Sequence, residues 1–166
     1  FNWKLVFCEM YACGKYNNND GESYEFSLGM NGLGLCSTQY SSEYMDVDIR
    51  RGGTRYTLHF EKGENVGGLK KEPYNTKDTG TKIRWKPELE VFTDIDIQPE
   101  YFLDIMKRQA IVNAGVEFVF RNQNGKSFDT TTYCYVNGIE DHVAEVIGEN
   151  GFTSVQHWTT EVKTRD

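Results

Sequence analysis

The residues with the clearest chemical potential are Gly29, Gly32 and Gly34 in the segment SLGMNGLGL at positions 27–35. Because glycine has no side chain, such a run lets several backbone N–H groups point into one concavity. A short helix is expected directly afterwards, from Leu33 through Tyr40, and the N-terminus of a helix attracts anions. The spacing therefore indicates a phosphate-binding loop. As a bare pattern it also fits a flexible turn, since it matches neither a P-loop nor a Rossmann fingerprint.

Hydrophobic periodicity predicts the elements around this loop. Residues at i, i+3, i+4 and i+7 predict an amphipathic helix from Trp3 to about Ala12. Alternating residues predict a hairpin of strands 45–50 and 56–61 around two glycines, an exposed connection over 62–79, and a strand that begins near Thr81 and stops at Pro87.

The second half repeats this mixture of helix and hairpin. A helix is expected to start at Pro99 and end near Gly115, two strands should meet at the Asn124-Gly125 turn, and residues 139–148 have helical spacing. Helices and hairpins in this order predict an α+β fold with a mixed, mostly antiparallel sheet and helices packed on one face. The length of 166 residues fits a single domain.

Composition excludes several classes of protein. Aromatic residues make up 14% of the chain, too many for a disordered linker, and no apolar stretch approaches the roughly 20 residues that span a bilayer. The net charge of −7 argues against a protein whose whole surface wraps nucleic acid, although a local basic face is compatible with it. Four cysteines without a CxxC motif predict reduced core thiols in a cytoplasmic protein: Cys8, Cys13, Cys36 and Cys134.

A wider pattern surrounds the glycine loop. The stretch ACGKYNNN at 12–19, followed by YEFSLGMNGLG at 24–34, resembles the ATP lid of the ATPase domain found in the B subunits of bacterial DNA gyrase and topoisomerase IV. The segments IRRGG at 49–53 and KDTGTKIRWKP at 77–87 are similar to their counterparts in that family in order and spacing. The resemblance implies a partial Bergerat-type (GHKL) ATPase domain over residues 1–166, with the lid at 14–34 and the following transducer domain close to the end of the chain.

The resemblance implies an ATP site with named contacts. The lid would reach the triphosphate through backbone N–H groups and Lys15, with Tyr24 near the nucleotide. Thr81, helped by Gly80, would bind on the adenine side, and Arg51 would lie at the pocket mouth. Each also has an ordinary structural interpretation as a loop, turn or strand residue. The full set of predicted ATP contacts is Lys15, Tyr24, Gly29, Met30, Asn31, Gly32, Leu33, Gly34, Arg51, Gly80 and Thr81.

The chain departs from the family pattern in several places. Leu28 replaces a lid glycine and restricts the loop, which counts against lid closure, while Asn31 replaces a histidine and Gln39 an asparagine. The family's catalytic glutamate and magnesium-binding asparagine are not matched here, since Glu9 and Asn2 do not fit that motif. We therefore expect an internal piece of the ATPase module that has no catalytic residue or metal ligand of its own and does not hydrolyse ATP alone.

The expected function is therefore that of a larger protein. The resemblance implies a cytoplasmic type IIA DNA topoisomerase that uses ATP and Mg²⁺, dimerises through its ATPase domain, and acts on DNA with a cleavage-subunit partner. The alternative interpretations are a non-enzymatic α+β interaction module and a degenerate paralogue without catalysis.

Overall fold

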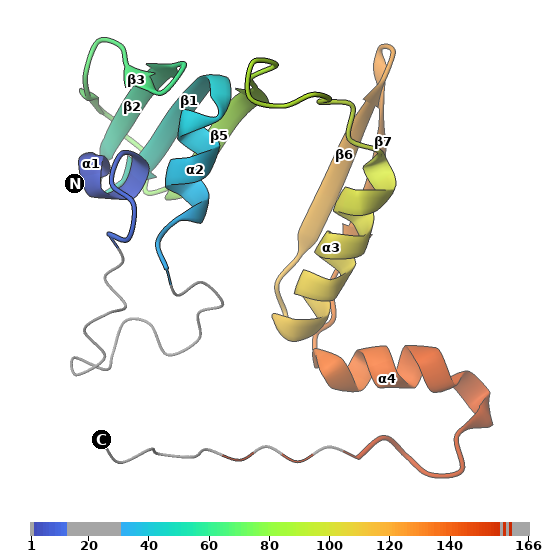
Figure 1. The fold of residues 1–166 in the computed structure, drawn as a ribbon. Helices are drawn as coiled ribbons and strands as arrows, with labels where there is room; N and C mark the ends of the chain where they lie inside the picture. Colours follow the sequence, from blue (N-terminus) through green and yellow to red (C-terminus); the bar gives the residue numbers. More distant parts are fainter. Residues whose placement is uncertain (1, 13–30, 157, 159, 161–166) are drawn as a thin grey trace, which may run out of the picture. The chain divides into compact units, whose positions relative to one another are not determined.

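The computed structural model describes residues 2–12, 31–156, 158 and 160 (Figure 1). The chain forms two compact units, Phe1–Ile95 and Asp96–Asp166, each described here by itself. The α+β prediction is confirmed: both units combine helices with strands, and every pairing between described strands is antiparallel. That the two units belong to one domain stays a prediction.

The first unit is built on a five-stranded sheet. Its strands run in the order β3-β2-β1-β5, and β4 also pairs with β2. The predicted hairpin is present, with Gly52 and Gly53 both at positive φ in its turn, and the third predicted strand ends at Pro87 as expected. The strands are β1 (Ser42–Arg51), β2 (Thr54–Glu61), β3 (Glu64–Asn65), β4 (Lys70–Pro73) and β5 (Gly80–Pro87).

The segment 62–79 differs from the expected plain connection. It contains β3 and β4, which both pair with β2 and so satisfy backbone groups at that edge of the sheet. A two-residue turn at Lys62 and Gly63, both at positive φ, starts this return. The short strands carry mostly exposed charged residues, so they lack the hydrophobic alternation that reveals a strand in a sequence.

Two short helices, α1 (Trp3–Phe7) and α2 (Gly34–Tyr40), lie on one side of the sheet (Figure 1). We call the side they cover the inner face and the opposite side the outer face. The core on the inner face consists of five buried residues, with Trp3 and Leu35 packed against them. These five are Phe7, Met45, Val47, Leu58 and Phe60.

The first helix is shorter than the periodicity predicts. It ends at Phe7, and Tyr11 takes a left-handed φ of 60°, which turns the chain away from a continued helix. Val6 and Met10 are consequently exposed, although the pattern placed them on the buried stripe. Phe7 and Trp3 do pack as expected, with ring centroids 5.6 and 6.1 Å from that of Phe60.

The second helix begins and ends close to the predicted positions. Cys36 is buried as predicted, Ser37 and Tyr40 are exposed, and Gln39 is fully buried. Both amide atoms of Gln39 are buried, and neither has a hydrogen-bond partner among the residues that the structure describes. A polar residue in the interior is the opposite of what hydrophobic patterning predicts, so no sequence signal favoured it.

The cysteines only partly follow the expectation of core thiols. Cys36 is fully buried and Cys8 half-buried, and burial raises the pKa of both thiols. Cys134 is exposed, so the prediction is wrong for this residue. It directly follows β7, whose residues are mostly exposed. Cys13 lies outside the described residues.

The second unit closely follows the sequence pattern. Pro99 occupies the first turn of its long helix, Gly115 follows that helix at a φ of +76°, and Ala110 is fully buried. The hairpin turns at Gly125, and the ring of Phe120 stacks on Phe102. The elements are α3 (Pro99–Val112), β6 (Phe118–Asn124), β7 (Ser127–Tyr133), α4 (Ile139–Ile147) and the 3-10 turn η3 (Gly148–Asn150).

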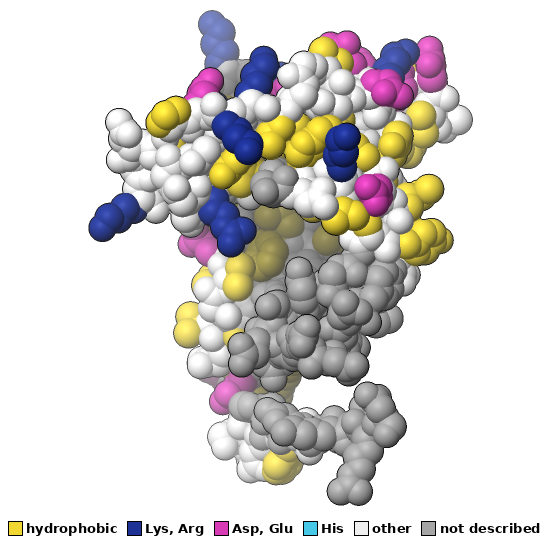
Figure 2. Space-filling view, turned by 90° about the vertical axis from the view of Figure 1, so that its left-hand side faces the viewer, with side chains coloured by type: hydrophobic (Ala, Val, Ile, Leu, Met, Phe, Trp, Pro, Cys, Tyr) yellow, Lys and Arg dark blue, Asp and Glu magenta, His cyan; other side chains and the backbone are white. Residues whose placement is uncertain are grey.

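Hydrophobic side chains also remain at the surface. On the face drawn in Figure 2 they lie beside separate Lys and Arg side chains. Among the exposed hydrophobic residues of the first unit are Ile83 and Trp85 on β5, which are 37% and 43% exposed. None of the helices in the described part of the chain has the length and apolar character that a membrane span requires.

Candidate functional site

The predicted lid falls mainly outside the part that the structure describes. Lys15, Tyr24, Gly29 and Met30 all lie outside the described residues. The end of the lid, residues 31–34, leads directly into α2.

The described end of the predicted lid has the backbone geometry of a helix start. Gly32 takes a φ of +61°, a conformation that a side chain disfavours, whereas Asn31 is an ordinary exposed residue. The carbonyls of Leu33 and Gly34 accept hydrogen bonds from Ser37 N and Thr38 Oγ1, both at 2.8 Å. These bonds anchor the first turn of α2, and the first N–H groups of any helix have no partner within the helix itself.

Three other predicted residues meet in one pocket. Arg51 lies at the end of β1 and Gly80 and Thr81 at the start of β5, and the antiparallel register pairs Arg50 with Gly80 and Ile49 with Thr81. We call the open pocket at this end of the sheet the β1–β5 pocket. It has a volume of about 620 Å³ and is lined by Ile49, Arg50, Arg51, Tyr56, Thr79, Gly80 and Thr81.

Strand alternation gives this pocket an apolar side. Thr81 and Ile83 lie on the inner face, in register with Ile49 and Val47 of β1. The buried core lies along β1 and β2, and β5 contributes no buried residue to it, so Ile83 remains 37% exposed. Thr81 is also exposed, and its hydroxyl has no hydrogen-bond partner within the described ranges. The arrangement can accept a flat apolar group with a hydrogen-bonding edge.

The two arginines at the pocket have different surroundings. Arg50 Nη1 donates a hydrogen bond to the hydroxyl of Tyr74 at 3.3 Å, and this bond holds the pKa of Tyr74 below its usual value. The guanidinium also lies 5.8 Å from the centre of the Tyr74 ring. Arg51 has no ion pair within the described part of the chain and is exposed. Arg51 is therefore the cation that can reach an anionic ligand.

The absence of a side chain at Gly80 keeps this corner free. A Cβ built there would lie 3.2 Å from Nη2 of Arg50, closer than most such contacts. Sequence reasoning did not identify Ile49 and Tyr56 as lining residues. The signal was available, because residues that alternate with Arg50 and Arg55 on the hairpin share the inner face with Thr81.

The chemistry of the pocket lining favours an anion over a metal ion. Among the described residues, no group of three or more His, Cys, Asp or Glu side chains could hold a metal ion. Every residue that lines the β1–β5 pocket is apolar, hydroxylated or cationic, apart from Gly80. Such a lining suits an anion with an apolar part rather than a bare cation.

Comparison with known proteins gives several relatives, although no protein-family model matches the chain. The B subunit of DNA topoisomerase 4 from Salmonella typhimurium is 28% identical over 145 residues, which is 87% of this chain and 22% of the relative. The B subunit of DNA gyrase from a Synechocystis species is 29% identical over 141 residues, 84% of this chain and 13% of the relative. The chain thus spans about a fifth or less of the length of these curated relatives.

Solved structures show the same fold. The 43K ATPase domain of Thermus thermophilus gyrase B, in complex with an aminocoumarin, superposes with a TM-score of 0.63 at 22% identity, over 71% of this chain and 32% of that one. The ATP-binding domain of Francisella tularensis topoisomerase IV gives 0.58 at 24% identity, over 66% and 56%. The predicted resemblance is confirmed: this chain is similar in sequence, over 87% of its length, to the B subunits of DNA gyrase and topoisomerase IV, and in fold to their ATPase domain.

Proposed function

We propose that the chain is part of the ATP-binding module of a cytoplasmic type IIA DNA topoisomerase, and that the β1–β5 pocket holds one side of the nucleotide. The observation that carries the proposal is the convergence of Arg51, Gly80 and Thr81. These residues come from two strands that are far apart in the sequence, yet they line one pocket. Its volume of about 620 Å³ lies within the range of small-molecule sites.

The base of the nucleotide fits the inner-face side of this pocket. A purine is a flat, largely apolar group with polar atoms at its edge, and Ile49 offers apolar surface beside Thr81, whose hydroxyl has no hydrogen-bond partner within the described residues. A hydroxyl both donates and accepts hydrogen bonds, so it can pair with either kind of edge atom. In this arrangement Thr81 orients the base, and Gly80 leaves room for it.

The phosphates fit the other side. The Arg51 guanidinium is exposed and without an ion pair in the described ranges, and five N–H donors on a planar cation match phosphate oxygens well. The lid residues 15–34 would close over the phosphates, with the N–H groups that lead into α2 as donors. This part of the proposal depends on residues that lie mostly outside the described ranges.

The wider activity belongs to the protein that carries this chain. ATP binding would dimerise its ATPase domains and, with a cleavage-subunit partner, would drive DNA strand passage, and hydrolysis would reset the dimer. From the resemblance we expect the magnesium ligand of the family in a part of the protein outside this chain. Without a positioned general base we expect the 166-residue chain alone not to hydrolyse ATP.

The test is nucleotide binding by the protein that carries this chain. Isothermal titration with a non-hydrolysable ATP analogue should show about tenfold weaker binding for Thr81→Ala, because a hydrogen bond to the base is lost, and weaker binding for Arg51→Ala. Thr132→Ala, at an exposed strand position in the second unit, is the matched control and should bind as the wild type does. Unchanged binding by both pocket variants would contradict the proposal and favour the interaction-module alternative.

A second measurement addresses the lid. Gly32 takes a left-handed φ of +61°, which valine strongly disfavours. We expect Gly32→Val to abolish dimerisation induced by the ATP analogue on a sizing column. Normal dimerisation of this variant would show that the loop does not bind phosphate through the backbone conformation described here.

A further inference from the structure

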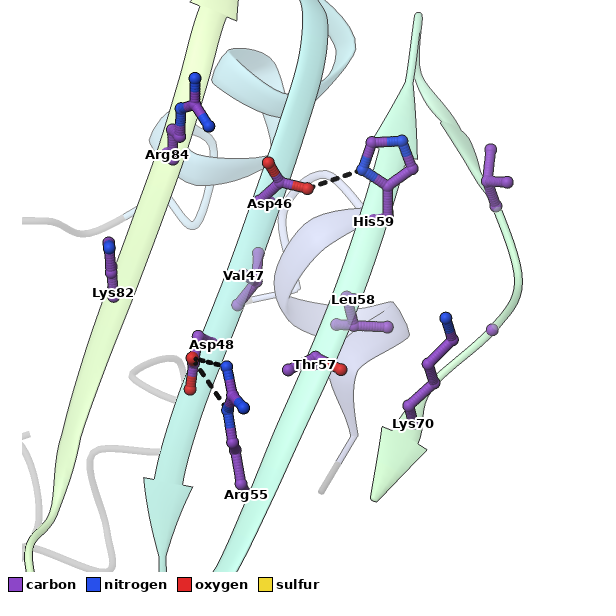
Figure 3. A pocket seen from close by; sticks show the side chains of 12 residues that line it. Asp46, Val47, Asp48, Arg55, Thr57, Leu58, His59, Lys70, Lys82 and Arg84 are labelled. Atoms are coloured by element: carbon purple, nitrogen blue, oxygen red, sulfur yellow. Dashed lines mark hydrogen bonds and ion pairs between the residues drawn. The ribbon is translucent and has the colours of Figure 1, made fainter. Parts of the chain in front are cut away.

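The outer face of the sheet carries a hollow that the nucleotide proposal does not use. Alternation along β1 places Asp46 and Asp48 on this face, opposite the core residues Met45 and Val47. Side chains from β1, β2, β4 and β5 surround a space of about 370 Å³, which we call the outer hollow (Figure 3). Its charged residues are Asp46, Asp48, Arg55, Lys70, Lys82 and Arg84, with His59 beside them.

The two carboxylates of the hollow are already bonded. Asp48 Oδ2 accepts hydrogen bonds from Arg55 Nε and Nη2 at 3.0 and 2.7 Å. These bonds are the main reason why the pKa of Asp48 lies below its usual value. Asp46 Oδ1 lies 2.7 Å from His59 Nδ1, while His59 Nε2 lies 3.0 Å from Glu61 Oε1. These carboxylate bonds raise the pKa of His59 and favour its charged form.

The remaining cations have no such partner. Lys82 and Arg84 on β5 and Lys70 on β4 form no ion pair within the described part of the chain (Figure 3). The Arg84 guanidinium lies 5.5 Å from the centre of the Tyr44 ring, which holds it over the face. The hollow has four Lys or Arg side chains and two carboxylates, whereas the whole chain has a net charge of −7. It is therefore a positive site on an acidic chain.

The spacing of these cations suits a duplex backbone. Lys82 and Arg84 are two residues apart on one strand, about 6.8 Å, which is twice the axial phosphate repeat along one DNA strand. Lys70 lies three strand spacings away, about 14 Å, across the sheet. That distance is close to the roughly 12 Å width of the major groove. Lys70 can therefore reach a phosphate on one side of the groove while Lys82 and Arg84 reach phosphates on the other side.

We propose that the outer hollow binds backbone phosphates of duplex DNA without reading its sequence. Phosphate contacts of this kind position a protein on DNA and carry no base information. The choice of DNA over another polyanion rests on the proposed topoisomerase function. The excess of positive charge in the hollow and its three cations without an ion pair in the described ranges are independent of that function. An acidic protein segment is the competing partner, and the test below separates the two.

The test uses the full 166-residue chain and a fluorescein-labelled duplex of about 20 base pairs in anisotropy titrations between about 50 and 200 mM NaCl. The double variant Lys82→Gln/Arg84→Gln removes two cations of the hollow. The control Lys77→Gln/Lys126→Gln removes two exposed lysines that do not line it. Circular dichroism establishes that both variants are folded.

We expect weak binding by the wild type, with a logarithmic salt slope that falls by about 1.8 in the hollow variant and not in the control. Over this fourfold range of salt, wild-type affinity would then drop roughly tenfold more than that of the variant. Lys70→Gln alone should lower the slope by about 0.9.

Three outcomes would overturn the proposal: no binding of the duplex by the wild type, equal slopes in the hollow variant and the wild type, or binding of a poly-glutamate peptide in place of the duplex. The ATP-analogue titration decides the nucleotide proposal independently. If either the duplex-binding titration or the ATP-analogue titration gives a negative result, the other can still be interpreted.

Discussion

The two units of the chain enclose very different interiors. In its described part, the first unit buries a cluster of five hydrophobic residues, and Cys36 as well, in a structure of a five-stranded sheet and two helices, whereas Ala110 is the buried hydrophobic residue that the described part of the second unit provides. A broad sheet covered by helices removes whole side chains from water, while a two-stranded hairpin on a helix leaves most of them half-exposed. The first unit is therefore held mainly by hydrophobic burial, and the second depends more on backbone geometry and polar contacts.

The largest expected effect comes from the core of the first unit. Phe60→Ala removes a ring that is 1% exposed and packs against both Phe7 and Trp3. We expect this substitution to lower the free energy of unfolding by about 3 to 5 kcal/mol. Phe128→Ala in the second unit, where the ring is 49% exposed, should cost about 1 kcal/mol or less. Urea unfolding followed by tryptophan fluorescence measures both. Equal losses of stability in the two variants would contradict the proposed difference between the two units.

In the second unit we expect a large loss of stability on substitution of a single glycine, Gly138. Gly138 has a φ of +61°, and an added Cβ would lie 3.1 Å from the carbonyl oxygen of Ile111 and 3.2 Å from Cβ of Ala114. Gly138→Ala should therefore destabilise this unit by about 1 to 3 kcal/mol. Gly148→Ala, at a φ of +57° in open space, isolates the conformational cost and should lose about 1 kcal/mol. Hydrogen exchange of the β6 and β7 amides is the measurement, and an equal loss in the two variants would exclude the steric contribution.

A polar cluster in the second unit should make it acid-sensitive. Glu145 accepts hydrogen bonds from the Tyr135 hydroxyl at 2.6 Å and from Lys107 Nζ at 3.1 Å, and these bonds lower the pKa of Glu145 to about 2. The ionised Glu145 side chain therefore stabilises the folded protein at pH values above its usual pKa near 4.5, and this stabilisation is lost as the pH falls towards 2. The stability of the wild type should fall more than that of Glu145→Gln between about pH 6 and pH 3. Parallel pH profiles would contradict this assignment.

The smallest expected effect is an opposite pH dependence in the first unit. Hydrogen bonds to Glu61 and Asp46 raise the pKa of His59 above 6.5 in the folded protein. The stabilisation is fully present below about 6.5 and is lost as the pH rises through the folded pKa. The advantage of the wild type over His59→Gln should shrink between about pH 6 and pH 9, and an NMR titration of the His59 ring gives its pKa directly. A pKa at or below 6.5 would show that the ion pairs do not form in solution.

Local patterns predicted most elements where one face of a strand or helix is buried. The hairpin around Gly52 and Gly53, the start of α3 at Pro99 and the turn at Gly125 all follow from residues adjacent in the sequence. The prediction was poorer for β3 and β4, because edge strands with exposed charged residues lack hydrophobic alternation. It also missed the interior position of Gln39, where packing placed a polar side chain in the core.

The site shows the same division. Arg51, Gly80 and Thr81 were found through a resemblance to known ATPase domains, and that resemblance is confirmed over most of the chain. Their meeting in one pocket depends on the antiparallel register between β1 and β5. The lid contacts at 15–30 stay predictions.

The α+β class, the principal helices and hairpins, and the family likeness could be predicted from the sequence, because these depend on hydrophobic period, turn residues and motif order along the chain. The pairing of charged side chains and the residues that meet across neighbouring strands became visible only in the folded chain. Arg50 is held by Tyr74, and Asp48 binds Arg55, while Arg51 and Lys82 have no ion pair in the described ranges. Such differences arise from strand register and side-chain geometry between residues distant in the sequence, which composition and spacing do not specify.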